Sequence, residues 1–161
     1  MNAVPQIRRI GHLQQDLLVG MYDEFDPLGA ALGLPPPKAE ARHEWVAAAL
    51  KQEVNLAAVT PAGEAVGHCF LVPGEQASAE MAVFVHQLFR RRGLGTALVN
   101  ATLERAREVG LRRVWAVTAS DNRAALRLQL RCGFRPAKSV SLETEMEFEF
   151  PAPRFRSLCA L

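Results

Sequence analysis

The stretch Phe89 to Leu98, with the sequence FRRRGLGTAL, constrains the fold more than any other part of this chain. Three arginines and two glycines separate an apolar segment, typical of a strand, from an uncharged segment that favours a helix. The first turn of a helix leaves backbone N–H groups unpaired and carries the positive end of the helix dipole. Gly93 and Gly95 permit positive φ and a close approach, so we expect this turn to bind a compact anion with several charges.

The composition limits where such an anion can bind. A chain of 161 residues is one domain by size, and its formal net charge is only +2. That charge disfavours the broad basic face of a nucleic-acid binder, so anion recognition must be local. No apolar run approaches the roughly 20 residues needed to span a bilayer, and the N-terminus does not resemble a signal peptide. Three widely spaced cysteines exclude a closed disulfide framework and a CxxC-type metal site, so we expect a cytoplasmic protein without a metal.

The first half of the chain is predicted to carry the flanking helices and a hairpin. Leu and Met at three- to four-residue spacing predict the first helix, whereas a run rich in Gly and Pro from Asp26 predicts a long loop. The expected elements are a strand over 4–10, helices over 12–25 and 39–50, and strands over 55–60 and 65–72.

The second half is predicted to alternate strands with helices. The expected elements are a strand over 80–86, a helix over 96–109, a strand over 111–118 covered on both faces, a helix within 120–134 and a strand over 141–150. Ser120 or Asp121 is the expected N-cap of the last helix. In the final strand apolar residues alternate with four glutamates, which predicts one buried and one solvated face. The order predicts an α/β fold with a mixed sheet whose parallel part lies in the second half.

Three phosphate-binding patterns compete for the arginine–glycine turn. A P-loop needs Gly-Lys-Ser/Thr, but no lysine occurs between Lys51 and Lys138. A dinucleotide fingerprint needs a small residue where Leu98 stands. The third pattern, Arg/Gln-x-x-Gly-x-Gly/Ala after a valine-containing strand, is matched by Arg90, Gly93 and Gly95.

In this pattern the chain resembles the GCN5-related N-acetyltransferases (GNAT), in which the turn binds the pyrophosphate of acetyl-CoA. A second signature, an Asn followed by a helix that ends in Gly-Phe, is matched by SDNRAALRLQLRCGF, in which Asn122, Ala125, Leu128, Gly133 and Phe134 are in register. The resemblance is close over residues 80–150 and extends to 1–79 only in the order of elements. It implies one GNAT domain over 1–161, with substrate-side elements at 4–79, an acetyl-CoA-binding core at 80–150 and a tail at 151–161.

The resemblance implies where the cosubstrate acetyl-CoA binds. The sheet is expected to splay between its fourth and fifth strands, so that pantetheine pairs with backbone groups of the fourth. The residues implied as contacts are Val83, Phe84 and Val85 for pantetheine and the thioester, Arg90, Arg91, Arg92, Gly93, Leu94, Gly95 and Thr96 for the pyrophosphate turn, and Asn122 beside the pantetheine arm.

The implied chemistry is direct attack by an amine on the thioester, assisted by a general base. Glu80, which opens the fourth strand, is the catalytic candidate; a solvated carboxylate is the alternative. Many members carry a tyrosine acid where this chain has Gln129, and we consider Tyr22 or Cys132 as stand-ins beside their interpretation as buried packing residues. His86 is interpreted as an ordinary polar residue. Gln87 replaces a family proline and is expected to alter only the exit of the strand.

The substrate side is open to two interpretations. Asp23, Glu24 and Asp26 beside Tyr22 and Phe25 either attract a cationic amine of a small molecule or peptide or form a solvated helix end over two core aromatics. His43 and Trp45 are interpreted as core or rim. Three function classes follow: an N-acetyltransferase, a catalytically weak acyl-CoA-binding module, and a nucleic-acid-binding domain, which the charge disfavours. The tail raises the alternative of a homodimer, which the sequence does not decide.

Overall fold

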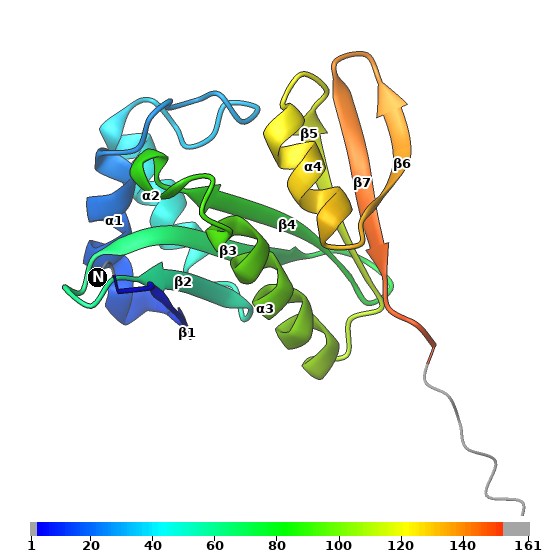
Figure 1. The fold of residues 1–161 in the computed structure, drawn as a ribbon, viewed down its shortest axis with the longest axis horizontal. Helices are drawn as coiled ribbons and strands as arrows, with labels where there is room; N and C mark the ends of the chain where they lie inside the picture. Colours follow the sequence, from blue (N-terminus) through cyan, green and yellow to red (C-terminus); the bar gives the residue numbers. More distant parts are fainter. Residues whose placement is uncertain (1–2, 153–161) are drawn as a thin grey trace, which may run out of the picture.

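Seven strands form one mixed sheet in the computed structural model of this chain, which describes residues 3–152 (Figure 1). Their order across the sheet is β1-β2-β3-β4-β5-β7-β6. The strands are β1 (Gln6–Arg9), β2 (Asn55–Val59), β3 (Ala65–Pro73), β4 (Ser78–Val85), β5 (Arg113–Ala119), β6 (Arg135–Val140) and β7 (Glu143–Glu149). The mixed α/β fold expected from the sequence is therefore confirmed.

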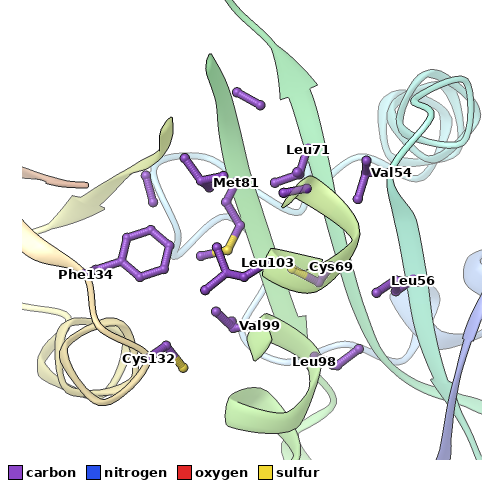
Figure 2. Packing of buried hydrophobic residues seen from close by; sticks show 14 of the residues in the cluster. Val54, Leu56, Cys69, Leu71, Met81, Leu98, Val99, Leu103, Cys132 and Phe134 are labelled. Carbon is purple, nitrogen blue, oxygen red and sulfur yellow. The ribbon is translucent and has the colours of Figure 1, made fainter. Parts of the chain in front are cut away.

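Two pairs of helices cover opposite faces of the sheet, because the strands present apolar side chains alternately to each side. The helices are α1 (Gln15–Asp23), α2 (Ala39–Ala49), α3 (Leu94–Glu108) and α4 (Arg123–Arg131), with short 3₁₀ turns η1 (His12–Gln14) and η2 (Gln87–Phe89). Leu98, Val99 and Leu103 of α3 pack on Cys69 and Leu71 of β3 and on Met81 of β4, and Phe134 borders the same core (Figure 2). A second core, which contains Tyr22, Val46 and Phe84, lies under α1 and α2.

The one parallel contact in the described sheet is incomplete. Ser78, Ala79 and Glu80 of β4 pair with Arg113, Val114 and Trp115 of β5, and beyond these residues the two strands are not hydrogen-bonded. Figure 1 shows β4 and β5 diverging, with α4 over β5. The splay expected between the fourth and fifth strands is confirmed.

Strand β6 was missed by the sequence analysis. All six of its residues are exposed, it contains Pro136, and it pairs only with β7, so it lacks the apolar alternation by which strands are recognised. The hairpin it forms also shortens β7, which begins at Glu143 and leaves Leu142 79% exposed.

Strand β5 is covered on one face, which corrects the expectation that both of its faces are buried. Val114, Ala116 and Thr118 are buried, whereas the residues between them are half-buried. On that second face Glu145 and Glu147 of β7 bond Arg113, at 2.6 and 2.9 Å. These two glutamates are therefore ion-paired, which corrects the expectation of a solvated carboxylate row.

No helix within residues 3–152 combines the length and apolar character needed to cross a membrane. Cys69 and Cys132 are buried free thiols. Cys159 lies outside the described residues, as do residues 153–161 of the tail considered for dimerisation.

Candidate active site

A cavity of about 290 Å³ lies where β4 and β5 separate. It passes between the two faces of the sheet, because residues of both cores contribute to its wall. Met81, Val83, Ala116, Thr118, Asn122, Ala125 and Gln129 line it on the α3–α4 side, and Glu80, Ala82, Phe84, Val117, Ala119, Ala31, Leu32 and Leu34 on the α1–α2 side. A chemical group entering from one face can therefore meet a group entering from the other.

The open edge of β4 offers backbone groups to this cavity. The N–H of His86 donates to the carbonyl oxygen of Val66, on the β3 side, at 2.9 Å. Because successive backbone groups alternate along a strand, the N–H of Phe84 also faces β3, and those of Val83 and Val85 face the edge from which β5 has departed. Val83 and Val85 thus present donors that the sheet does not use.

The arginine–glycine turn joins β4, through η2, to the N-terminus of α3. Arg91 and Gly93 both adopt left-handed backbone conformations, with φ of 60° and 78°. The Ala97 N–H makes the bond that closes this turn, to the Gly93 carbonyl oxygen at 3.1 Å. The N–H groups of Leu94, Gly95 and Thr96 therefore have no acceptor within their own helix, and they lie at the positive end of its dipole.

The two glycines have different roles, which corrects the expectation that both permit positive φ. Gly93 has positive φ and open space where a Cβ would stand. Gly95 lies inside α3 with ordinary helical geometry; a Cβ there would lie 3.1 Å from Leu128 Cδ2 and 3.6 Å from Val85 Cγ2. Gly95 therefore allows the start of α3 to approach α4 and β4 closely.

The three arginines diverge. The Arg90 guanidinium donates to the carbonyl oxygens of Val85 and Asp26, both at 2.9 Å, and lies 5.1 Å from the ring centroid of Phe25. The Arg92 guanidinium lies over the ring of Phe89 at 5.4 Å. Arg91 is exposed. Partial burial lowers the pKa of Arg90, which Asp26 opposes.

Among the described residues that line the cavity, Glu80 is the only charged one. Its side chain is half-buried on the face that α1 and α2 approach. Burial raises its pKa above the usual value, and the nearby Glu145 carboxylate raises it further. A carboxylate with a raised pKa is the type of group that accepts a proton near neutral pH.

Gln129, which stands where the resemblance implies a tyrosine acid, is buried and hydrogen-bonded to a neighbour. Its amide nitrogen donates to Thr118 Oγ1 at 2.9 Å, and its Oε1 lies 3.3 Å from the same atom. The pairing holds α4 against β5 beside the cavity. Sequence reasoning missed Thr118, because only the fold brings it to Gln129.

The considered stand-ins for the acid do not reach the cavity. Tyr22 is fully buried, its hydroxyl bonds His68 Nδ1 at 2.7 Å, and burial raises its pKa well above the usual value for tyrosine. Cys132 is buried at the end of α4, and burial raises its pKa as well. His86 accepts a hydrogen bond from the Leu88 N–H and begins η2. Neither Tyr22 nor Cys132 lines the cavity, and His86, interpreted from the sequence as an ordinary polar residue, is a buried N-cap of η2.

Asn122 is the N-cap of α4, in place of the expected Ser120 or Asp121. Its Oδ1 accepts from the Ala125 N–H at 3.2 Å. The amide also lines the cavity, so one residue both begins the helix and borders the site.

On the substrate side, Asp23 is already paired and does not form an anionic wall. Arg42 and His43 bond its carboxylate at 2.8 and 2.9 Å, and these contacts hold the pKa of Asp23 below its usual value. Trp45 packs edge-on against Tyr22 and Phe84 as a core residue. The loop between α1 and α2 instead contributes Ala31, Leu32 and Leu34 to the cavity, a contribution that no motif in the loop marks.

Comparison with known proteins gives concordant matches. The Acetyltransferase (GNAT) family matches residues 18–134. An L-methionine sulfoximine/L-methionine sulfone acetyltransferase of Pseudomonas paraeruginosa is 34% identical to this chain over 99 residues. The match covers 58% of this chain and 58% of that curated relative, so this chain spans little more than half of the relative's length.

Solved structures of other proteins share the fold. The GNAT domain of S. lividans PAT has a TM-score of 0.79 at 19% identity, covering 92% of this chain and 97% of that one. YncA of Salmonella typhimurium, solved with its cofactor acetyl-CoA, has a TM-score of 0.74 at 19% identity and covers 98% and 100%. This chain belongs to the GNAT acetyltransferase family.

Proposed function

We propose that the protein transfers an acetyl group from acetyl-CoA to a primary amine of a small molecule or peptide. The proposal rests on three features that lie together where β4 and β5 separate. They are the unused N–H donors of β4, the unpaired N–H groups at the start of α3, and the Glu80 carboxylate, whose pKa is raised. Binding of acetyl-CoA in YncA, a protein of the same fold, supports the choice of donor.

The chain's own groups fit the donor. The N–H groups of residues 91–96 bind the pyrophosphate, assisted by the charge of Arg91 and Arg92. The Val83 and Val85 N–H groups bind the pantetheine arm and the thioester oxygen, where one donor in a dry site stabilises a developing oxyanion by about 3 kcal/mol. The Asn122 amide borders the arm.

The amine enters on the α1–α2 side, where Glu80 accepts its proton, directly or through one water. The amine nitrogen then attacks the thioester carbon, a C–N bond forms, and the C–S bond breaks. The leaving group departs as a thiolate, because Gln129 has no acidic proton to give it. As the C–S bond breaks, the new amide nitrogen loses its second proton to water, and the thiolate takes up a proton from the solvent.

The name of the curated relative suggests a class of acceptor for the test. That enzyme is described as acetylating L-methionine sulfoximine and L-methionine sulfone, so α-amino acids belong in the panel. The panel also contains alkyl amines, polyamines and peptides, because a single carboxylate such as Glu80 gives no specificity for one amine over another.

The test is release of free thiol from acetyl-CoA with each amine of the panel. Turnover with any amine above the hydrolysis rate supports the proposal. The alternative function is a catalytically weak acyl-CoA-binding module, which the bonded Gln129 favours. Coenzyme A binding with no turnover across the full panel would favour that module, and absence of coenzyme A binding would contradict both.

A further inference from the structure

The substrate loop, residues 24–38 between α1 and α2, forms one wall of the cavity but has little structure of its own. Its Ala31, Leu32 and Leu34 line the cavity. Within the loop, the Gly29 N–H donates to the Pro35 carbonyl oxygen at 2.8 Å, and Ala31 and Leu34 exchange hydrogen bonds. The position of this wall must therefore be set by contacts with the rest of the molecule.

The C-terminal end of the substrate loop is bonded to Arg42, a residue of the helix that follows it directly. Arg42 of α2, only 6% exposed, donates to the carbonyl oxygens of Pro36 and Pro37 at 3.0 and 2.9 Å and pairs with Asp23. This contact closes the loop locally, but it does not attach the loop to the strand that forms the opposite wall.

The beginning of the loop is held by two residues distant in sequence. Gln87 of η2 donates from Nε2 to the Glu24 carbonyl oxygen at 2.7 Å, and its Oε1 accepts from the Asp26 N–H at 3.0 Å. Arg90 donates to the Asp26 carbonyl oxygen and covers the face of Phe25. Three successive loop residues are thus fixed to the segment that follows β4.

Arg90 also connects this contact to the cavity edge. Its Nε donates to the Val85 carbonyl oxygen at 2.9 Å, so one planar guanidinium bridges β4 and the substrate loop. Both acceptors are backbone carbonyl oxygens, and without the Arg90 guanidinium they would have to accept hydrogen bonds from water. The same guanidinium is consequently not directed to a diphosphate in this structure.

We propose that Gln87 and Arg90 are positioning residues for the amine substrate, which fix the start of the substrate loop to the exit of β4 and so set one wall of the cavity. The inference rests on the proposed function and assigns Arg90 a task other than holding the coenzyme. It also gives Gln87 a task that needs both ends of its side-chain amide, since one end donates to Glu24 and the other accepts from Asp26.

The kinetic test uses Arg90→Ala and Gln87→Ala with an amine found in the panel. Each variant is expected to raise the KM for the amine about tenfold, the effect of losing either a charged donor (Arg90) or two neutral hydrogen bonds (Gln87). The dissociation constant of coenzyme A, measured by calorimetry, is expected to stay within about twofold. Arg90→Lys, which keeps a cationic donor, should recover part of the loss.

Matched controls are Leu88→Ala, an exposed neighbour in η2, and Arg107→Ala, an exposed arginine near the far end of α3. Because both positioning residues bond Asp26, the double variant should cost less than the product of the single effects. If Arg90→Ala weakens the binding of coenzyme A by the same factor as it raises the KM for the amine, the inference is wrong and Arg90 belongs to the pyrophosphate site.

A second measurement does not require turnover. Hydrogen exchange of peptides covering residues 24–38 should accelerate in both variants, with peptides of α3 and β5 unchanged. Unchanged exchange in the substrate loop would refute the inference even if the enzyme is active. Faster exchange in a protein that acetylates no amine would refute the proposed function and leave the loop contact standing.

Discussion

At the residue scale, Glu80 derives its character from its neighbours. Its backbone pairs with Trp115 in the last register before β4 and β5 separate, so its side chain lies at the point where the cavity begins. Partial burial and Glu145 both favour the protonated form. Arg113 tempers this effect, since it bonds the carboxylate of Glu145.

Replacing Glu80 by Gln is expected to lower kcat by about a hundredfold, the usual contribution of a general base. The rise of kcat/KM with pH that accompanies deprotonation of Glu80 should disappear as well. An unchanged pH profile in steady-state assays with one amine would show that another base acts.

Replacing Glu145 by Gln should shift the rise of kcat/KM to lower pH, because the native Glu145 carboxylate raises the pKa of Glu80. Removing the negative charge lowers the pKa of Glu80, so the activity rises at a lower pH than in the native enzyme. Glu104→Gln, on the exposed side of α3, serves as control and should leave the profile in place. A shift toward higher pH would contradict the assignment.

At the scale of elements, the turn before α3 combines backbone strain with unpaired donors. Arg91 is a non-glycine residue in the left-handed region, a conformation that costs on the order of 1 kcal/mol and clusters at functional sites. Gly93, the N-cap of α3, has the same handedness. The turn therefore depends on glycine for conformation at 93 and for close packing at 95.

Gly93→Val is expected to weaken coenzyme A binding about tenfold, because a β-branched residue at positive φ costs roughly 1–2 kcal/mol and displaces the amides. Gly93→Asn, whose side chain tolerates this conformation, is the matched variant and should bind nearly as tightly as the native protein. Calorimetric titration with coenzyme A measures both. Equal affinities in the native and valine proteins would count against an anion site in the turn.

At the scale of the whole molecule, a buried polar chain joins both sides of the second core. His68 of β3 bonds Tyr22 of α1 through Nδ1 at 2.7 Å and Asn55 of β2 through Nε2 at 2.6 Å. Because the Asn55 amide nitrogen already donates to Ala49, its Oδ1 must accept. His68 Nε2 therefore carries the proton, and the Tyr22 hydroxyl donates to Nδ1.

Burial lowers the pKa of His68 to about 3, so acid should destabilise the fold. Between about pH 6.5 and pH 3 the unfolded chain binds a proton that the folded chain excludes, and stability falls as pH falls, by at most about 1.4 kcal/mol per unit. Denaturant unfolding at pH 7 and pH 5 measures this slope. His68→Gln removes the titrating group and should flatten the slope whatever its effect on absolute stability; an equally steep slope would show that other groups cause it.

The sequence predicted the parts of this molecule that local chemistry determines. Helix α2, β2 and β3 lie within one or two residues of expectation, because apolar periodicity and the surrounding Gly and Pro define them. The turn followed from the spacing of Arg90, Gly93 and Gly95, and α3 from the apolar face that begins at Ala97 and Leu98. What escaped prediction depends on long-range contacts: the exposed edge strand β6, the Arg113 ion pairs, and the bonds from Gln87 and Arg90 to a loop some sixty positions earlier.

The burial of two cysteines has a practical consequence for studying this protein. Cys69 is fully buried with a pKa raised to about 12, and Cys132 is also buried with a raised pKa, so neither thiol reacts readily with maleimides. With Cys159 replaced by Ser, Leu142→Cys at the exposed hairpin tip would give a single site for a fluorescent dye, since Leu142 lines a second hollow that shares Leu32 and Ala119 with the cavity. Such a dye would report acceptor binding optically, without waiting for product.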